Sequence, residues 1–189
     1  TELLSTPTAL RALPRDVASG VTSSVEVALQ DVFFWAVPIM VLSFVLSWRL
    51  KEIPDPPPVL YIKRSIIPED ERAVAVVGTR GPTTYGREAA SVLTGDLSKN
   101  GITIVSGLAR GIDGISHRAA IENGGRAIAV VANGLDIVYP SEHSGLSRRA
   151  AENGAVVSEY PLGVRPNPRS FPRRNRLISG LSLGTLVIE

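Results

Sequence analysis

The chain has 189 residues, of which 44% are hydrophobic and 20% are charged, a balance typical of a globular protein rather than a disordered one. It contains no cysteine, which excludes disulfides, thiolate metal sites and cysteine nucleophiles, and two histidines are too few for a histidine-rich metal site. Of its 20 basic residues only Lys51, Lys63 and Lys99 are lysines, although the net charge is only +2. The remaining arginines present a planar fork that suits phosphate and carboxylate groups.

The sequence divides into three parts, and we expect it to be a piece of a longer protein at both ends. Residues 1–54 contain a long uncharged segment, and residues 55–60 form a linker in which Asp55 is followed by three prolines. Consecutive prolines favour a stiff, extended chain. Residues 61–189 form the third part, which we expect to be an α/β domain that lacks its C-terminal end.

An uncharged segment runs from Val32 to Trp48, and Arg49 and Lys51 follow it directly. Taken as a helix with its preceding residues, it would span roughly 25–33 Å, close to the thickness of a bilayer core. A tryptophan followed by basic residues is typical of the cytoplasmic end of a membrane helix. We therefore predict a membrane helix over about 27–48, and the alternative is a helix buried in a soluble protein.

The third part alternates short apolar segments with helical patterns. The apolar segments are rich in valine and isoleucine without polar alternation, as in parallel strands that are buried on both faces. This alternation predicts a Rossmann-like, doubly wound α/β fold with a mostly parallel sheet, whose ligands bind at the carboxyl ends of the strands. The expected strands are 73–78, 102–107, 127–134, 155–161 and 185–189, and the expected helices are 86–101, 113–125, 144–154 and 173–182.

Two glycine-rich turns follow the first two expected strands. The first, Gly78-Thr79-Arg80, leads to a helix that starts near Thr84, so that free N–H groups and an arginine face one space. The second runs from Ser106 to Asp113 and contains Arg110, and Asp113 stands where it could cap the next helix. Two such turns at adjacent strand ends predict a shared anion-binding crevice, whereas one alone would also fit a plain turn with a solvated arginine.

Two titratable residues near these turns have a structural and a chemical interpretation. His117 lies one helical turn after Asp113, and we favour a packed structural histidine over a catalytic base because no nucleophile stands nearby. Asp136 could hydrogen-bond a ribose or brace its own loop. We favour bracing, because a carboxylate would repel a phosphate ligand in the same crevice.

The stretch after the fourth expected strand is strongly basic. From Arg165 to Arg176 it contains five arginines and no acidic residue, and Phe171 lies among prolines in what we expect to be an irregular segment. Arginines that follow phosphates and an aromatic ring that stacks on a base are typical of single-stranded nucleic-acid binding. The alternative is a solvated basic loop with Phe171 docked on the rim of the sheet.

These motifs together resemble the DNA-processing protein A (DprA/Smf) family. The resemblance lies in V-G-T-R at 77–80, S-G-L-A-R-G-I-D at 106–113, G-L-D with Y-P at 134–140, E-Y-P at 159–161 and F-P-x-R-N-R at 171–176. It implies a cytoplasmic protein without catalysis or cofactor, which binds single-stranded DNA in natural transformation and presents it to the RecA recombinase. It also implies a homodimer, although the missing end of the sheet counts against one. The implied DNA contacts are Gly78, Thr79, Arg80, Ser106, Gly107, Arg110, Gly111, Phe171, Arg173, Arg174, Asn175 and Arg176.

Two further resemblances complete the sequence-based expectations. Residues 1–54 resemble the end of a multidrug transporter of the major facilitator superfamily, which here would serve at most as a membrane tether. The glycine-rich turns also resemble Rossmann-like enzymes that hydrolyse nucleoside monophosphates and release the base. Those enzymes carry a P-G-G-x-G-T-x-x-E signature that does not occur in this sequence.

Overall fold

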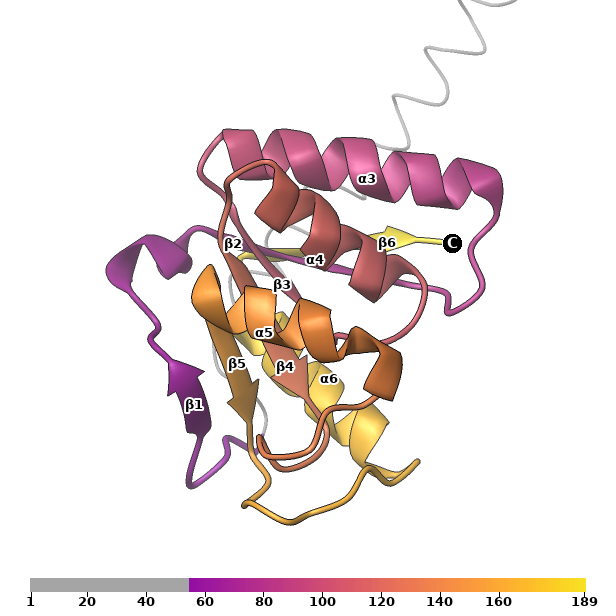
Figure 1. Cartoon of the computed structure of the whole chain (residues 1–189). Helices are drawn as coiled ribbons and strands as arrows, with labels where there is room; N and C mark the ends of the chain where they lie inside the picture. The colour runs from indigo at the N-terminus through magenta and orange to yellow at the C-terminus, as the bar shows by residue number, and fades with distance from the viewer. Residues whose placement is uncertain (1–54) are drawn as a thin grey trace, which may run out of the picture. The chain divides into compact units, whose positions relative to one another are not determined.

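The third part of the chain forms a mixed six-stranded sheet with helices on both faces (Figure 1). The computed structural model describes residues 55–189. The predicted membrane helix at 27–48 and the transporter-like segment 1–54 lie outside the described residues. Within residues 55–189, no helix has both the length and the apolar character needed to span a bilayer.

The strands lie in the order β1-β5-β4-β3-β2-β6, and all neighbours are parallel except β1, which pairs antiparallel with β5. The five strands expected from the apolar segments are therefore confirmed, as is the mostly parallel α/β sheet. The strands are β1 (Tyr61–Arg64), β2 (Ala73–Gly78), β3 (Thr103–Ser106), β4 (Ala127–Val131), β5 (Gly154–Ser158) and β6 (Gly184–Ile188).

Helices cover the two faces of the sheet unequally. Three of them pack on one face, namely α3 (Thr84–Lys99), α4 (Ile112–Glu122) and α5 (Ser144–Glu152), and α6 (Ser170–Gly180) packs on the other. Ile104 of β3 joins the core below the three helices, and the next residue, Val105, joins the core below α6. Because successive side chains of a strand point to opposite faces, a continuous apolar strand can serve both cores. Two short 3-10 helices, η1 (Pro68–Glu71) and η2 (Ser141–His143), complete the described elements.

Three expectations about local structure need correction. Strand β1 was not expected, because Tyr61–Arg64 carries two basic residues and leaves most of its side chains exposed at the edge of the sheet. The expected strands 127–134 and 155–161 end earlier, at Val131 and Ser158. Helix α6 begins at Ser170, so Phe171 lies in the first turn of a helix rather than in an irregular segment. A proline at residue 172 is compatible with this, since the first turn needs no N–H donor.

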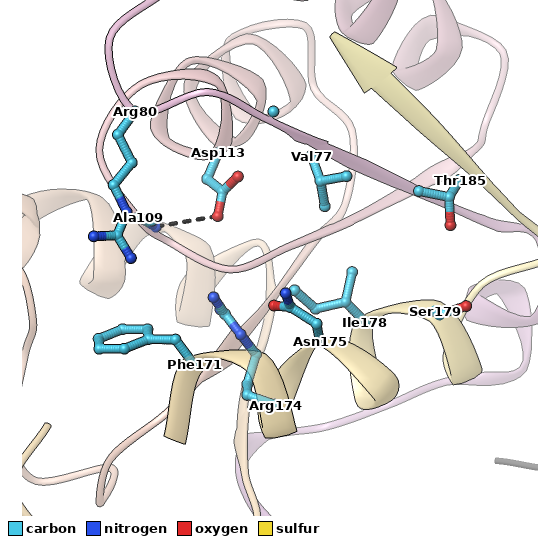
Figure 2. Close-up of a pocket in the computed structure, with 11 residues that line it drawn as sticks. Val77, Arg80, Ala109, Asp113, Phe171, Arg174, Asn175, Ile178, Ser179 and Thr185 are labelled. Carbon is cyan, nitrogen blue, oxygen red and sulfur yellow. Dashed lines mark hydrogen bonds between the residues drawn. The ribbon is translucent and has the colours of Figure 1, made fainter. Parts of the chain in front are cut away.

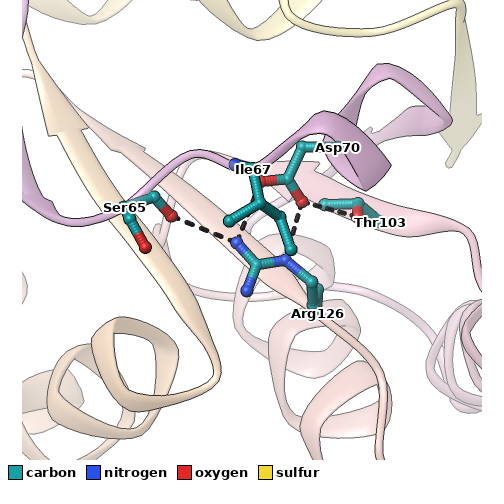
Figure 3. A network of polar contacts seen from close by, with 5 residues as sticks. All are labelled: Ser65, Ile67, Asp70, Thr103 and Arg126. Carbon is teal, nitrogen blue, oxygen red and sulfur yellow. Dashed lines mark hydrogen bonds and ion pairs between the residues drawn. The ribbon is translucent and has the colours of Figure 1, made fainter.

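A buried ion pair fastens the connection between β1 and β2 to the sheet (Figure 3). The Arg126 guanidinium donates to both carboxylate oxygens of Asp70, at 2.8 and 2.9 Å, and the Thr103 hydroxyl donates to the same carboxylate at 2.8 Å. Burial alone would raise the pKa of Asp70, but the hydrogen bonds from Arg126, Ile67 and Thr103 outweigh it and lower that pKa. The same guanidinium donates to the Ser65 carbonyl, at 3.1 Å.

Candidate nucleic-acid interface

A pocket of about 290 Å³ opens where the turns after β2 and β3 meet helix α6 (Figure 2). Strand β2 continues into α3 on one face of the sheet, whereas its neighbour β6 is reached from α6 on the other face. Ligands of open α/β sheets bind at such a change of direction. The lining residues are Val77, Gly78, Arg80, Ala109, Asp113, Phe171, Arg174, Asn175, Ile178, Ser179 and Thr185.

An arginine and a phenylalanine line the pocket, and a tyrosine lies beside the phenylalanine. The guanidinium carbon of Arg80 lies 5.4 Å from the centre of the Phe171 ring, within the range of a cation–π contact. The ring of Tyr139 lies 5.7 Å from that of Phe171, tilted by 49°. Arg80 and Phe171 were predicted to share a site, and the structure brings them together. Tyr139 was not predicted as a site residue, although it belongs to the Y-P motif of the family resemblance.

Arg174 lies under the pocket and is only 4% exposed. Its guanidinium donates to the Gly107 carbonyl at 2.7 Å and to the Val130 carbonyl, while its Nε has no partner among the described residues. Burial lowers the pKa of Arg174, and the nearby Asp113 carboxylate opposes that shift. A Cβ atom at position 107 would lie 2.0 Å from the Arg174 Nη1, so a glycine is required there to make room for the arginine.

The two glycine-rich turns are joined by their backbones. The amide of Ile112 donates to the Thr79 carbonyl at 3.1 Å, and a Cβ atom on Gly111 would lie 2.2 Å from that same oxygen. Gly111 also has a φ of 76°, which side-chain-bearing residues rarely adopt. The two turns therefore meet in one corner, as predicted, with Arg80 exposed on it, and anion binding there stays a prediction.

Asp113 does not cap helix α4 as predicted, because Gly111 is the N-cap residue and Asp113 lies in the first turn. Its carboxylate instead accepts from the amides of Gly107 at 3.2 Å and Ala109 at 3.4 Å, and so shapes the turn after β3. Burial raises the pKa of Asp113, and the charge of Arg174 and these amides oppose the rise.

Other predicted contacts lie in the packing around the pocket. Ser106 is buried, and its hydroxyl donates to the Val76 carbonyl at 2.6 Å. A Cβ atom on Gly78 would lie 2.0 Å from the Ile188 carbonyl oxygen, so this glycine allows β2 and β6 to pair closely. The backbone of Thr79 is held between β6 and α4, through Glu189 and Ile112. Contact of these three residues with DNA stays a prediction.

The N-terminus of α3, which was expected to face the same anion site, is occupied by a carboxylate. The backbone amide of Thr83 donates to Glu189 at 2.9 Å, and the Thr83 hydroxyl donates to the same carboxylate. These hydrogen bonds lower the pKa of Glu189. The expected anion position at the start of this helix is thus already filled by a side chain of the chain itself.

The remaining predicted arginines lie around the pocket rather than in it, and each has an acidic partner. The exposed Arg110 pairs with Glu142 beside the turn after β3. On α6, Arg173 lies 3.7 Å from the carboxylate of Asp55, and Arg176 donates to Glu159 at 2.7 Å. Asn175, the remaining predicted contact on α6, differs from these arginines because it lines the pocket, where it is exposed.

The two titratable residues with alternative interpretations are both held by the fold. His117 is completely buried, and burial, together with the charge of Arg174, lowers its pKa to about 4. It is therefore neutral at pH 7, in agreement with a structural role. Both carboxylate oxygens of Asp136 accept from the Gly163 amide at 3.0 Å, in agreement with the expected bracing role.

Comparison with known proteins gives consistent relatives. A family model described as DNA recombination-mediator protein A matches residues 43–189, and so begins within the segment predicted to be a membrane helix. The DNA processing protein DprA of Bacillus subtilis is 44% identical over 141 residues, 74% of this chain and 48% of that protein. Protein Smf of Escherichia coli is 45% identical over 136 residues, 71% of this chain and 36% of that protein. The chain thus spans about half or less of the length of these curated relatives.

Solved structures agree with these relatives. DNA processing protein A of Streptococcus pneumoniae superposes with a TM-score of 0.70 at 41% identity, over 75% of this chain and 50% of that one. The protein of the same name from Helicobacter pylori, solved for its single-stranded DNA binding mode, gives a TM-score of 0.66 at 34% identity, over 73% of this chain and 64% of that one. None of these findings supports the resemblance of residues 1–54 to a transporter.

Proposed function

The chain belongs to the DNA recombination-mediator protein A family, and from this premise we propose that its α/β domain binds single-stranded DNA at the pocket beside α6. The observation that carries the proposal is the position of Arg80 over Phe171 at the mouth of a pocket that also contains Arg174. A cation beside an aromatic ring matches the two parts of a nucleotide that are always present, the phosphate and the face of the base. The Rossmann-like, doubly wound fold expected from the sequence is consistent with binding at this edge.

The predicted contacts differ in the roles that this geometry supports. Arg80 and Asn175 are exposed at the pocket and can reach a backbone phosphate or a base edge directly. Phe171 holds the Arg80 guanidinium and offers apolar surface to a base. Arg174 adds positive charge from below and fixes the turn at Gly107. We assign Arg110, Arg173 and Arg176 to the periphery, where DNA phosphates would compete with their carboxylate partners.

Fluorescence anisotropy with a labelled oligo-dT strand tests this proposal. Binding should weaken steeply as salt is raised, because bound phosphates release counterions. Arg80→Ala should lower the affinity and reduce the slope of log K against log salt by about 1. Phe171→Ala should lower the affinity about fivefold or more with a smaller change in slope.

A matched control is Arg148→Ala, which removes an exposed arginine from α5, on the face of the sheet opposite α6. This variant should bind oligo-dT as the parent chain does. Absence of binding at low salt would contradict the proposal, as would Arg80→Ala and Phe171→Ala variants that bind like Arg148→Ala. Duplex DNA of the same length should compete weakly, because the bases must be unpaired to meet an aromatic ring.

The proposed activity is binding without catalysis. The alternative, hydrolysis of a nucleoside monophosphate to a free base, is tested by incubating the chain with AMP and following release of adenine. Adenine release that Arg80→Ala abolishes would replace the binding proposal with the enzymatic one. The lack of the P-G-G-x-G-T-x-x-E signature in the sequence favours the binding function.

Family membership supports a further step, in which the bound strand is presented to the RecA recombinase in natural transformation. We propose that the domain does this on the cytoplasmic side of the membrane, and the homodimer implied by the family resemblance stays a prediction. RecA filament formation on oligonucleotides coated with single-strand binding protein should start sooner when the chain is added. Light scattering of the chain alone tests the homodimer.

The membrane helix at 27–48 and the domain boundaries at 54 and 60 rest on the sequence alone. We propose that residues 1–54 tether the domain to the inner membrane, because the uncharged segment has the length of a bilayer core. Carbonate-resistant retention in membranes that is lost on deletion of residues 1–54 would support the tether. Retention of the deleted chain, or release of the full chain by carbonate, would contradict it.

A further inference from the structure

Tyr139 lies beside the predicted DNA-binding residues although its role was not foreseen. It belongs to the connection between β4 and η2, whereas its neighbour Phe171 belongs to α6, and the two ring centres lie 5.7 Å apart. Tyr139 remains 43% exposed although its ring contacts another aromatic side chain. A ring of this kind is available to a ligand.

The connection that carries Tyr139 is rigid. The side-chain amide of Asn133 donates to the carbonyls of Gly134 at 2.9 Å and Ile137 at 2.6 Å, so the turn is closed on itself. The backbone amide of Gly134 donates to the Val164 carbonyl at 2.9 Å, which fastens the turn to the segment leading into α6. The turn before Tyr139 is therefore braced, which reduces the entropic cost of presenting the ring to a ligand.

The geometry of the two rings shows that one base cannot lie between them. At 5.7 Å and a tilt of 49° they are already in contact, within the usual range for aromatic pairs. Arg80 in turn lies over the Phe171 ring, so part of that ring is covered before any ligand binds. The uncovered surface of Tyr139 is thus a separate stacking surface next to the first one.

Positive charge adjoins this second surface. Arg110, which pairs with Glu142, lies near Tyr139. The phosphates that flank a base on Tyr139 would have two arginines nearby, Arg80 over the Phe171 ring and Arg110, for which they would compete with the Glu142 carboxylate. This alternation of rings and cations is what a single strand requires along its length.

We propose that Tyr139 is a base-stacking residue, which takes the unpaired base next to the one held at Phe171. The proposal rests on the proposed single-stranded DNA binding and extends it from one base to two. It names a residue and a ligand group, an unpaired nucleobase of any identity, because every base offers a π face.

The test compares four variants for oligo-dT affinity by anisotropy. Tyr139→Ala should weaken binding about fivefold or more, while Tyr139→Phe, which keeps the ring, should change it by less than about twofold. Tyr139→Leu keeps apolar bulk without the aromatic face and should weaken binding as the alanine variant does. The control, Tyr85→Ala, removes a tyrosine that is 77% exposed on α3, and should have no effect.

A second measurement links the ring to bases rather than to phosphates. Replacing the bases of the oligonucleotide by abasic sites should lower the affinity of the parent chain more than that of Tyr139→Ala, since the variant has already lost one stacking contact. Thermal unfolding of each variant identifies any loss of fold, and Tyr139→Leu and Tyr139→Phe carry the comparison if the alanine variant unfolds.

The possible failures are distinguishable. If the parent chain does not bind oligo-dT at all, the proposed function is wrong. If Phe171→Ala weakens binding while Tyr139→Ala and Tyr139→Leu bind like Tyr85→Ala, the function stands and the second stacking position is wrong. If Tyr139→Phe weakens binding as much as Tyr139→Ala, the hydroxyl rather than the ring makes the contact, and the stacking role is wrong.

Discussion

Two arginines at opposite ends of the strands show how one residue type serves two purposes. Arg126 lies just before β4 and meets the Asp70 carboxylate in two hydrogen bonds, so its charge is neutralised within the fold. Arg174 lies at the carboxyl ends of the strands, where it meets backbone carbonyls and forms no ion pair with any residue in 55–189. Both guanidiniums are removed from most of the solvent, but only Arg126 is hydrogen-bonded to a carboxylate, whereas Asp113 lies near Arg174 without a direct ion pair.

The difference separates a structural network from a binding surface. A buried charge with a complete set of partners is a closed arrangement that has nothing left for a ligand. A buried charge without a direct ion pair keeps part of its desolvation cost, and an incoming anion can relieve that part. The exposed Arg80 stands above Arg174, so the carboxyl edge concentrates positive charge where a phosphate can approach.

The largest expected effect is on stability, and it concerns the ion pair of Asp70 and Arg126. Arg126→Leu leaves the buried Asp70 carboxylate without its cation and should lower the free energy of unfolding by about 3 kcal/mol, measured by urea denaturation. Oligo-dT affinity of the folded fraction should not change. The double variant Asp70→Leu with Arg126→Leu should recover part of the loss, because no unpaired charge remains. A double variant less stable than the single one would contradict this account of the network.

The stability of the fold should depend on pH through the buried His117. Because the pKa of His117 is about 4 in the folded chain and 6.5 in the unfolded one, only the unfolded state takes up a proton between these values. The stability it contributes is complete above pH 6.5 and should fall by up to about 3 kcal/mol as the pH drops to 4. Urea denaturation at pH 7, 5.5 and 4.5 should show a shallower fall for His117→Met. Equal slopes for the variant and the parent would show that His117 is not held neutral.

Arg174→Met tests the arginine without a direct ion pair, and it should lower both the unfolding free energy and the oligo-dT affinity. The carbonyls of Gly107 and Val130 lose their donor, and we expect a loss of about 2 kcal/mol in unfolding free energy. Oligo-dT affinity should fall as well, in contrast to Arg126→Leu, when both are measured at a temperature where the variants are folded. Unchanged affinity would mean that Arg174 only stabilises the fold and that Arg80 is the cation of the pocket that binds DNA.

Much of the fold could be predicted from the sequence, because its strands are continuous apolar segments with no competing helical period. Residues 73–78 illustrate this, since the predicted strand and β2 have the same bounds. Strand β1 could not be predicted in the same way. Its four residues are mostly polar and become a strand only because β5 offers an antiparallel edge, which is a tertiary effect.

The motifs of the candidate site could be predicted from the sequence, but the burial and contacts of individual side chains could not. The two turns and the Phe171 stretch do converge, because the carboxyl ends of parallel strands share one edge. The sequence does not distinguish the buried Arg174 from its exposed neighbour Arg173, since that depends on which side of α6 faces the sheet. Tyr139 was missed for a similar reason, because its contact with Phe171 depends on how the loop is braced.

The smallest expected effect concerns an arginine whose acidic partner is exposed to solvent. This arrangement is intermediate between those of Arg126 and Arg174. Arg173 on α6 lies 3.7 Å from the Asp55 carboxylate, and both side chains are mostly exposed. Asp55→Asn removes this negative charge and keeps the Asp55 carbonyl that accepts from Arg176 at 3.1 Å.

We expect Asp55→Asn to raise oligo-dT affinity about twofold and to steepen its salt dependence, because exposed ion pairs are weak and a freed cation can meet a phosphate instead. Glu152→Gln, which removes an exposed carboxylate from α5, is the matched control for the change in net charge. A gain of the same size in both variants would mean that net charge alone is responsible. An unchanged or weaker affinity for Asp55→Asn would place Arg173 outside the DNA path and confine the surface to the pocket of Arg80, Phe171 and Arg174.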